Sequence, residues 1–160
     1  MSVETMAELK LTAKEIMTKN PITLKKDTPV KQAAEILSEN NIGGAPVVDD
    51  DGNLIGIITE SDLIAQDIRL HFPTYIQLLD GYIYLPGSLR HFEEEFKKAI
   101  GAKVGDVMTT DVITVNEDTT LEDMATFMVE YDIGRLPVVS HGEVIGIVTK
   151  SDLVKAISRK

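Results

Sequence analysis

Two stretches of sequence decide the fold: IGGAPVVDDDGNLIGIITESDL at residues 42–63 and IGRLPVVSHGEVIGIVTKSDL at residues 133–153. They share most of their residues in the same order, and the second is one residue shorter in its central turn. The match continues upstream, where EIMTKNPITLKKDTPVKQAAEIL aligns with DVMTTDVITVNEDTTLEDMATFM, 91 residues later. A long ordered match of this kind indicates two copies of one structural unit.

Each copy predicts the order β-α-β-β-α. In the first copy, Ile22–Leu24 is a short β-rich run, and a helix follows, capped by Asp27 or Thr28 with Pro29 in its first turn. Two apolar strands joined by a turn come next, and Thr59 opens a closing helix. The expected elements of the second copy are residues 112–115, 120–131, 136–140, 143–148 and 151–158.

One unit of about 50 residues leaves too much apolar sheet exposed to be stable alone. We therefore expect an α/β (α+β) fold in which two β-α-β-β-α units pack sheet to sheet around a pseudo-twofold axis. The predicted organisation is an N-terminal extension (1–12), repeat one (13–70), an aromatic-rich helical insert (71–103) and repeat two (104–160). Met17 and Met108, which precede the first strands, are expected to fill core space.

Composition excludes several classes of function. The 160 residues include 16 basic and 26 acidic side chains, a net charge of −10, and no cysteine. Disulfides, thiolate nucleophiles and cysteine-ligated metals are excluded, and an acidic surface disfavours nucleic-acid binding. No apolar run approaches the roughly 18 residues of a membrane span, and the N-terminus lacks a signal-peptide pattern. We expect a cytoplasmic protein that contacts neither nucleic acid nor membrane.

The duplicated pattern resembles the tandem CBS-domain pair, or Bateman module. The resemblance rests on EIMT or DVMT before the first strand, then the helix, G-x-x-P-V-V and G-I-[IV]-T-x-S-D-L, all present twice. It implies a regulatory sensor that binds AMP, ADP, ATP or S-adenosylmethionine in clefts between the repeats and forms a homodimer. The pair fills nearly the whole chain, so we expect it to act in trans on an unidentified protein target or through dimer geometry.

The residues themselves favour a nucleotide site where the last strand of each repeat enters its closing helix. Thr59 and Asp62, like Thr149 and Asp152, lie at a helix N-terminus, whose free N–H groups and dipole suit phosphate. The threonine hydroxyl can donate to phosphate, and the aspartate can accept from two ribose hydroxyls. The same T-x-x-D spacing is also that of a helix capping box, and both roles stay open.

Small residues before each strand leave room for a flat base. The resemblance implies that adenine lies near these segments and the first strand of each repeat. The candidate residues are Gly43, Pro46, Ile22 and Thr23 in repeat one and Gly134, Pro137, Ile113 and Thr114 in repeat two. The alternative is that the glycines only serve a helix C-cap and a bend.

The two repeats differ in charge. Arg135 stands where repeat one has Gly44, and Lys150 where repeat one has Glu60. We predict that the cleft built on repeat two prefers AMP, ADP or ATP, because arginine and lysine favour phosphate. The cleft built on repeat one would bind phosphate weakly, prefer a neutral or cationic adenosyl ligand, or stay empty. Solvated surface charge is the alternative interpretation of both cations.

The insert carries a hydrophobic pattern of its own. Residues 64–70 are predicted to continue the closing helix, 74–79 to form a short helix, 82–87 to be extended and 88–99 to form an amphipathic helix. We expect a hydrophobic flap over the module or at the dimer seam; a partner-docking arm or a ligand lid is the alternative.

No residues form a catalytic or metal pattern. The three histidines, His71, His91 and His141, are dispersed, and residues 49–52 read as a turn rather than a calcium loop. We therefore expect no enzyme, no metal site and no cofactor beyond a regulatory adenosyl ligand. A structural dimerisation module with vestigial clefts is the alternative function.

Overall fold

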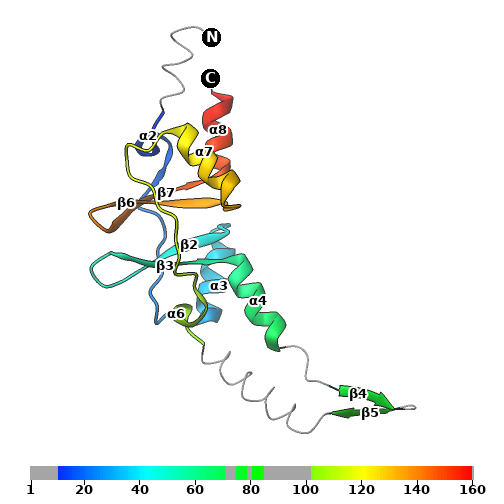
Figure 1. Ribbon diagram of the computed structural model, residues 1–160. Helices are drawn as coiled ribbons and strands as arrows, with labels where there is room; N and C mark the ends of the chain where they lie inside the picture. The colour runs from blue at the N-terminus through cyan, green and yellow to red at the C-terminus, as the bar shows by residue number, and fades with distance from the viewer. Residues whose placement is uncertain (1–10, 71–74, 79–80, 85–101, 160) are drawn as a thin grey trace.

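Two small antiparallel sheets form the centre of the molecule. The computed structural model describes residues 11–70, 75–78, 81–84 and 102–159. Strands β2 (Gly44–Val48) and β3 (Leu54–Thr59) form one sheet, and the order β1-β7-β6 forms the other. These last strands are Thr18–Lys19 (β1), Arg135–Ser140 (β6) and Glu143–Thr149 (β7). The two hairpins lie one above the other (Figure 1) and meet at their tips, where Leu54 N donates to Gly142 O over 3.1 Å.

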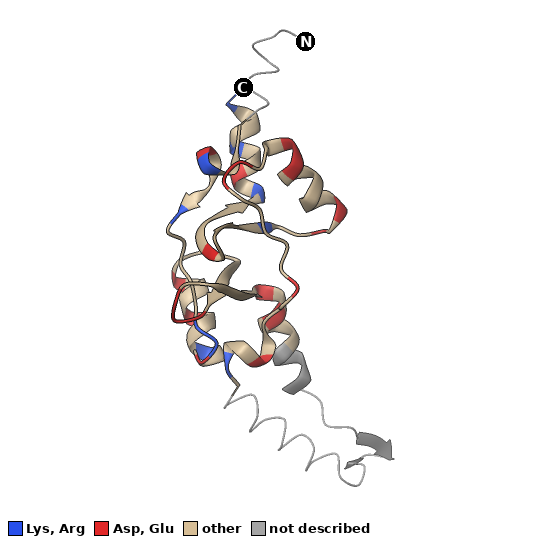
Figure 2. Cartoon of the chain, turned by 60° about the vertical axis from the view of Figure 1, so that its left-hand side comes forward, with Lys and Arg blue, Asp and Glu red and all other residues tan. Residues whose placement is uncertain are grey.

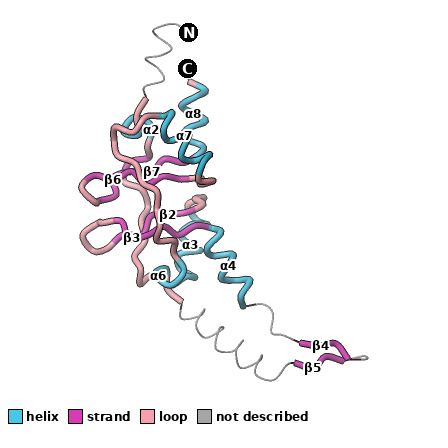
Figure 3. Tube along the Cα trace, viewed as in Figure 1, coloured by secondary structure: helices cyan, strands magenta, loops and turns pink. Residues whose placement is uncertain are grey.

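Helices cover the outer side of each sheet. In repeat one these are α3 (Val30–Glu39) and α4 (Glu60–Leu70), and in repeat two α7 (Leu121–Glu130) and α8 (Lys150–Ser158). Figure 3 shows the resulting layers: helices, two sheets at the centre, and helices again. The predicted α+β fold is confirmed. It follows from the helical spacing of buried side chains such as Ala33 and Leu37 in α3 and Met124 and Met128 in α7.

Paired contacts repeat around a pseudo-twofold axis. The bridge between Thr12 and Thr120 has its equivalent in the bridge between Lys103 and Pro29. Thr18 pairs with Ile147 in the same way as Thr109 pairs with Ile57. Each of these contacts joins one repeat to the other, so the axis relates two interlocked halves.

The short helix that opens each repeat packs into the core of the opposite repeat. Helix α2 (Ala13–Ile16) places Ala13, fully buried, in the core that β6, β7, α7 and α8 form. Helix α6 (Val104–Val107) places Val104, fully buried, among the core residues of β2, β3 and α3. The domain bounds remain a prediction, but the packing crosses them, so neither repeat has a complete core without the other.

The two methionines behave as expected. Met17 packs against the core of repeat two, and Met108 packs against that of repeat one. Each sulfur lies over a glycine of the opposite sheet: a Cβ on Gly56 would come within 2.6 Å of Met108 Sδ, and Met17 Sδ lies against Gly146. These glycines therefore leave space for the methionine of the other half.

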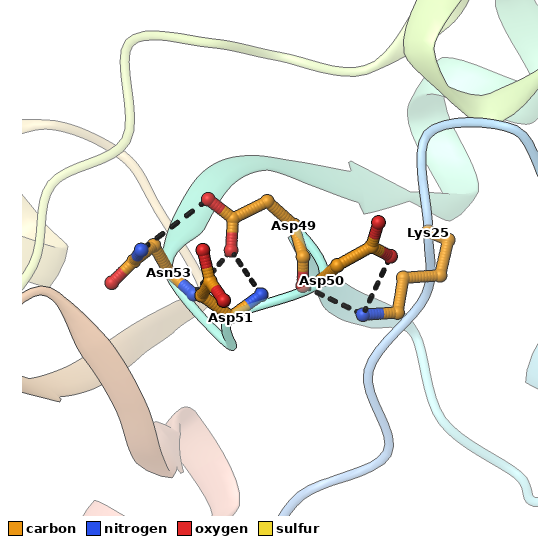
Figure 4. A network of polar contacts seen from close by, with 5 residues as sticks. All are labelled: Lys25, Asp49, Asp50, Asp51 and Asn53. Atoms are coloured by element: carbon orange, nitrogen blue, oxygen red, sulfur yellow. Dashed lines mark hydrogen bonds and ion pairs between the residues drawn. The ribbon is translucent and has the colours of Figure 1, made fainter.

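The turn at residues 49–53 is held by one carboxylate (Figure 4). Asp49 Oδ1 accepts from the backbone N–H groups of Asp51 and Asn53, both at 2.9 Å, and Lys25 Nζ donates to Asp49 O over 2.6 Å. These backbone bonds favour the ionised form, so the pKa of Asp49 lies below its ordinary value of 3.8. The interpretation of this acidic run as a turn is confirmed.

Three local predictions need correction or lie outside the described residues. The cap of α3 is Pro29 itself, without a side-chain bond, and not Asp27 or Thr28. Residues 75–78 form strand β4 (Tyr75–Leu78), paired with β5 (Gly81–Tyr84), so the short helix predicted there is wrong. Its β-branched and aromatic residues favour strand once a partner strand follows. The helix predicted at 88–99 falls outside the described residues.

No helix among the described residues is long and apolar enough to cross a membrane. Within that same part of the chain, no group of three or more acidic or histidine side chains is placed to hold a metal ion. His141 lies in the β6–β7 turn, while His71 and His91 are outside the described residues.

Candidate ligand clefts between the two repeats

Both strand-to-helix junctions form the same hydrogen-bonded unit. At the start of α8, Thr149 N donates to Asp152 Oδ2 over 2.8 Å, and Thr149 Oγ1 donates to the same oxygen over 3.0 Å. Asp152 N donates in return to Thr149 Oγ1 over 3.3 Å. Thr59 and Asp62 repeat these bonds at 3.0, 3.1 and 3.4 Å. The capping interpretation of T-x-x-D is thus confirmed for the structure as it stands.

The two aspartates differ in their second oxygen. Thr109 Oγ1 donates to Asp62 Oδ1 over 3.2 Å, so both oxygens of Asp62 are engaged. Thr18 is the pseudo-twofold mate of Thr109, yet among the described residues nothing donates to Asp152 Oδ1. As far as the described residues go, Asp152 Oδ1 is therefore open to a ligand hydroxyl.

One cleft, called here the Thr149 cleft, has a volume of about 490 Å³. Repeat one supplies the segment 18–22, which begins in β1, and the loop before β2, and repeat two supplies the start of α8. The lining residues are Thr18, Asn20, Pro21, Ile22, Asn41, Ile42, Gly43 and Gly44 from repeat one, and Arg135, Ile147, Thr149, Ser151, Asp152 and Lys155 from repeat two.

The pseudo-symmetric counterpart of this cleft, called the Thr59 cleft, has a volume of about 320 Å³. It reverses the contributions of the two repeats. The start of α4 comes from repeat one, and the segment 109–113 and the loop before β6 come from repeat two. The lining residues are Gly43, Ile57, Thr59, Glu60 and Ser61, with Thr109, Asp111, Val112, Ile113, Asp132, Ile133, Gly134 and Arg135.

Each cleft is therefore shared between repeats, which changes the grouping of the predicted site residues. Ile22 lines the cleft of Thr149 and Asp152 and not that of Thr59, whereas Gly43 lines both clefts. Ile113 and Gly134 face Thr59, and Asp62 is not among the residues that line that cleft.

The other predicted site residues lie off the cleft walls. Pro46 and Pro137 are fully buried in their strands, and Thr23, Thr114 and Lys150 line neither cleft. Lys150 instead approaches Gly134, where an added Cβ would lie 3.7 Å from Lys150 Cε. The prediction that Lys150 shares a cleft with Arg135 and Thr149 is therefore wrong, because Lys150 does not line the Thr149 cleft.

Charge separates the two clefts. The Thr149 cleft has two cations, Arg135 and Lys155, against Asp152. The Thr59 cleft has Arg135 against three carboxylates, those of Glu60, Asp111 and Asp132. Figure 2 shows acidic residues spread over both repeats, against fewer basic ones. A phosphate is therefore favoured in the Thr149 cleft.

Sequence reasoning missed two residues that α8 contributes to the Thr149 cleft. Lys155 follows Asp152 by three residues on α8, and Ser151 lies in the first turn of the same helix. Residues three apart share a helix face, so this spacing could have placed Lys155 beside the aspartate.

Comparison with known proteins identifies relatives of both repeats. The family model for the CBS domain matches residues 13–68 and 104–159. The uncharacterized protein MJ1426 of Methanocaldococcus jannaschii is 39% identical over 151 residues, covering 90% of this chain and 89% of that protein. The chloroplastic CBS domain-containing protein CBSX1 of Arabidopsis thaliana is 36% identical over 149 residues, covering 91% of this chain and 63% of its own length. This chain thus spans less than two thirds of CBSX1.

Solved structures share the fold. CBSX2 in complex with AMP has a TM-score of 0.73 and 32% identity, with 92% of this chain and 96% of that chain covered. The CBS domain pair of MJ0100, in complex with 5′-methylthioadenosine and S-adenosyl-L-methionine, has a TM-score of 0.68 and 28% identity, with coverage of 92% and 96%.

Proposed function

Because the chain belongs to the CBS-domain family, as a tandem pair of repeats, we propose that it is a regulatory sensor that binds an adenosyl ligand in the Thr149 cleft. The observation that carries this proposal is Asp152 Oδ1 at the start of α8, which accepts no hydrogen bond from the described residues and lies in a cleft with two cations. AMP in CBSX2, and 5′-methylthioadenosine with S-adenosyl-L-methionine in the MJ0100 pair, support an adenosyl ligand.

The lining of the cleft suits each part of a nucleotide. Asp152 Oδ1 accepts from the ribose hydroxyls, and Ile22 with Ile42 offers apolar surface to the base. Arg135 and Lys155 attract phosphate, and the N-terminus of α8 adds its dipole. The preferred ligand class is therefore an adenine nucleotide such as AMP, ADP or ATP.

The Thr59 cleft serves a different ligand or none. Its three carboxylates disfavour phosphate and favour a neutral or cationic adenosyl group, such as that of S-adenosylmethionine. Both oxygens of Asp62 already accept hydrogen bonds, from Thr59 and Thr109, so Asp62 is less available to a ribose than Asp152. This is the observation that favours the second candidate, a structural module with a vestigial cleft on that side.

A thermal-shift screen tests the sensor against the structural module. We expect AMP, ADP or ATP at millimolar concentration to raise the melting temperature by about 5 °C, since ligand at 100 times its Kd adds about 2.7 kcal/mol. S-adenosylmethionine and 5′-methylthioadenosine complete the screen, and GMP is the control for the base. Absence of any shift with every adenosyl compound would favour the structural module.

Regulation by this chain needs a second molecule, and we propose a homodimer as the first level of assembly. Four exposed apolar side chains belong to α7 and α8 or follow them directly, and these helices lie side by side (Figure 1). They are Val129, Tyr131, Val154 and Ile157, with Val129 81% exposed. Exposed apolar groups of this size favour burial against a second copy.

Light scattering after size exclusion tests the dimer and this face together. We expect a dimer at micromolar concentration, and a monomer when Val154→Asp and Ile157→Asp are combined. Lys31→Glu, a charge reversal on exposed α3, is the control and keeps the dimer. A wild-type monomer would contradict the proposal.

A further inference from the structure

Arg135 reaches from repeat two into repeat one. It is the first residue of β6 and pairs with Thr149, whereas its counterpart Gly44 pairs with Thr59. A Cβ added to Gly44 would lie 2.9 Å from Arg135 Cδ and 3.1 Å from Nε, and the guanidinium nitrogen Nη2 lies against Gly43. The two glycines form the surface on which the arginine side chain rests.

This position sets Arg135 on the boundary between the two clefts. Both Arg135 and Gly43 line the Thr149 cleft and the Thr59 cleft. Arg135 is the only cation among the lining residues of the Thr59 cleft, while the Thr149 cleft also has Lys155. One guanidinium thus faces two sites, and repeat one has glycine where a second arginine would stand.

We propose that Arg135 is a shared phosphate-binding residue, so that a phosphate-bearing ligand in one cleft weakens the binding of a second one in the other cleft. The inference rests on the proposed adenosyl-binding function. It goes further by predicting how the two clefts influence one another.

The physical reason is that phosphates in the two clefts compete for the same guanidinium N–H donors of Arg135. A guanidinium binds one phosphate with two parallel N–H bonds, and turning toward that phosphate takes its charge away from the opposite cleft. The Thr59 cleft would then keep Glu60, Asp111 and Asp132 without a cation. Because binding free energies are linked, the effect is reciprocal.

The coupling should depend on phosphate and not on the nucleoside. Adenosine carries no group that recruits Arg135, so the two clefts should bind it independently. AMP differs from adenosine only by the phosphate, which makes the pair a matched set of probes.

Calorimetric titration of variants with one filled cleft measures the coupling. Ile22 lines the Thr149 cleft and Ile113, its mate 91 residues later, lines the Thr59 cleft. Ile22→Trp therefore fills the first cleft and Ile113→Trp the second. The coupling factor is the Kd of the second AMP on the wild-type chain divided by the Kd of AMP on Ile22→Trp.

We expect a coupling factor of about 10 or more for AMP, the size expected for one charge-assisted bond, and about 1 for adenosine. In an Arg135→Gln background the factor for AMP should fall to about 1. Circular dichroism and a melting curve would show that each variant is folded.

Three results would overturn the proposal. Equal AMP affinities at the two wild-type sites exclude coupling, and coupling that survives Arg135→Gln assigns it to another group; both leave the adenosyl-binding function intact. A wild-type chain that binds neither AMP nor adenosine rejects the adenosyl-binding function, and the coupling with it.

Discussion

Thr109 donates a 3.2 Å hydrogen bond to Asp62 Oδ1, and this bond has no counterpart between Thr18 and Asp152 among the described residues. The two aspartates occupy equivalent positions in the repeats and cap equivalent helices with their other oxygen. Within the described part of the chain, both oxygens of Asp62 therefore accept hydrogen bonds, whereas only Oδ2 of Asp152 does. Together with the cations beside Asp152, this difference makes the two clefts chemically unequal.

Lys155 should contribute to phosphate binding and not to nucleoside binding. It lines the Thr149 cleft beside Asp152, so removal of its charge in Lys155→Gln should weaken AMP binding about 10-fold and leave adenosine binding unchanged. Titration calorimetry with both compounds measures this, and the AMP affinity should also depend less on salt.

Glu60→Gln is the matched control, because Glu60 lines the Thr59 cleft and not the Thr149 cleft. We expect it to leave the tighter AMP site unchanged and to strengthen the weaker one. An equal loss of AMP and adenosine affinity in Lys155→Gln would indicate a packing role for the lysine instead.

The packing of each short helix into the opposite repeat should contribute to the free energy of unfolding. Val104 is fully buried in the core of repeat one, although it lies at the start of repeat two. Val104→Ala should lower the free energy of unfolding by about 1–3 kcal/mol, since it leaves a cavity. Urea unfolding measures the loss, and Val129→Ala, at a side chain 81% exposed, should leave stability nearly unchanged.

A two-step unfolding curve for the wild-type chain would contradict this interlocked arrangement. Two independent cores would melt separately, whereas cores that each depend on a helix of the other half should unfold together.

Asp49 should make stability depend on pH in the acid range. Hydrogen bonds from the backbone of Asn53 and Asp51 hold its pKa below 3.8, so the folded state is favoured above that pH. As the pH falls below 3.8 through the lowered pKa, the carboxylate is protonated and the stabilisation is lost. The stability difference between wild type and Asp49→Ala should therefore be largest near neutral pH and shrink as the pH falls below 3.8.

This difference is measured from the urea unfolding midpoints of both proteins at several pH values between roughly 2.5 and 7. Asp50→Ala is the control, because that carboxylate lies 3.9 Å from Lys25 Nζ and accepts no hydrogen bond among the described residues. A difference between wild type and Asp49→Ala that stays constant with pH would contradict the role of the ionised carboxylate.

The sequence predicts the helices and hairpins of each repeat well, because their signals are local. The strands predicted at residues 22–24 and 112–115 are reduced to single bridges at Leu24 and Val115. Val30, Ala33 and Leu37 mark a helix by their spacing, and the apolar runs around residues 49–53 mark a hairpin. Residues 75–78 show the limit: a short apolar run suits helix or strand, and pairing with β5 decides it.

The composition of the clefts depends on contacts that no local pattern contains. Ile22 and Thr149 belong to different repeats and meet only because the sheets pack about the pseudo-twofold axis. Sequence reasoning grouped residues by repeat and thus joined Lys150 to Arg135 and Thr149. It did identify the T-x-x-D pairs and the imbalance of charge, since both are properties of residue identity.

The most direct test of the account compares Asp152→Asn with Asp62→Asn by calorimetric titration of adenosine and AMP. Asparagine keeps an oxygen for the helix cap but removes the second carboxylate acceptor that the ribose requires. We predict that Asp152→Asn weakens both ligands at the tighter site by at least about 10-fold, whereas Asp62→Asn leaves that site unchanged. Equal affinities in both variants and the wild type, or a loss confined to Asp62→Asn, would contradict the assignment of the Thr149 cleft as the principal site.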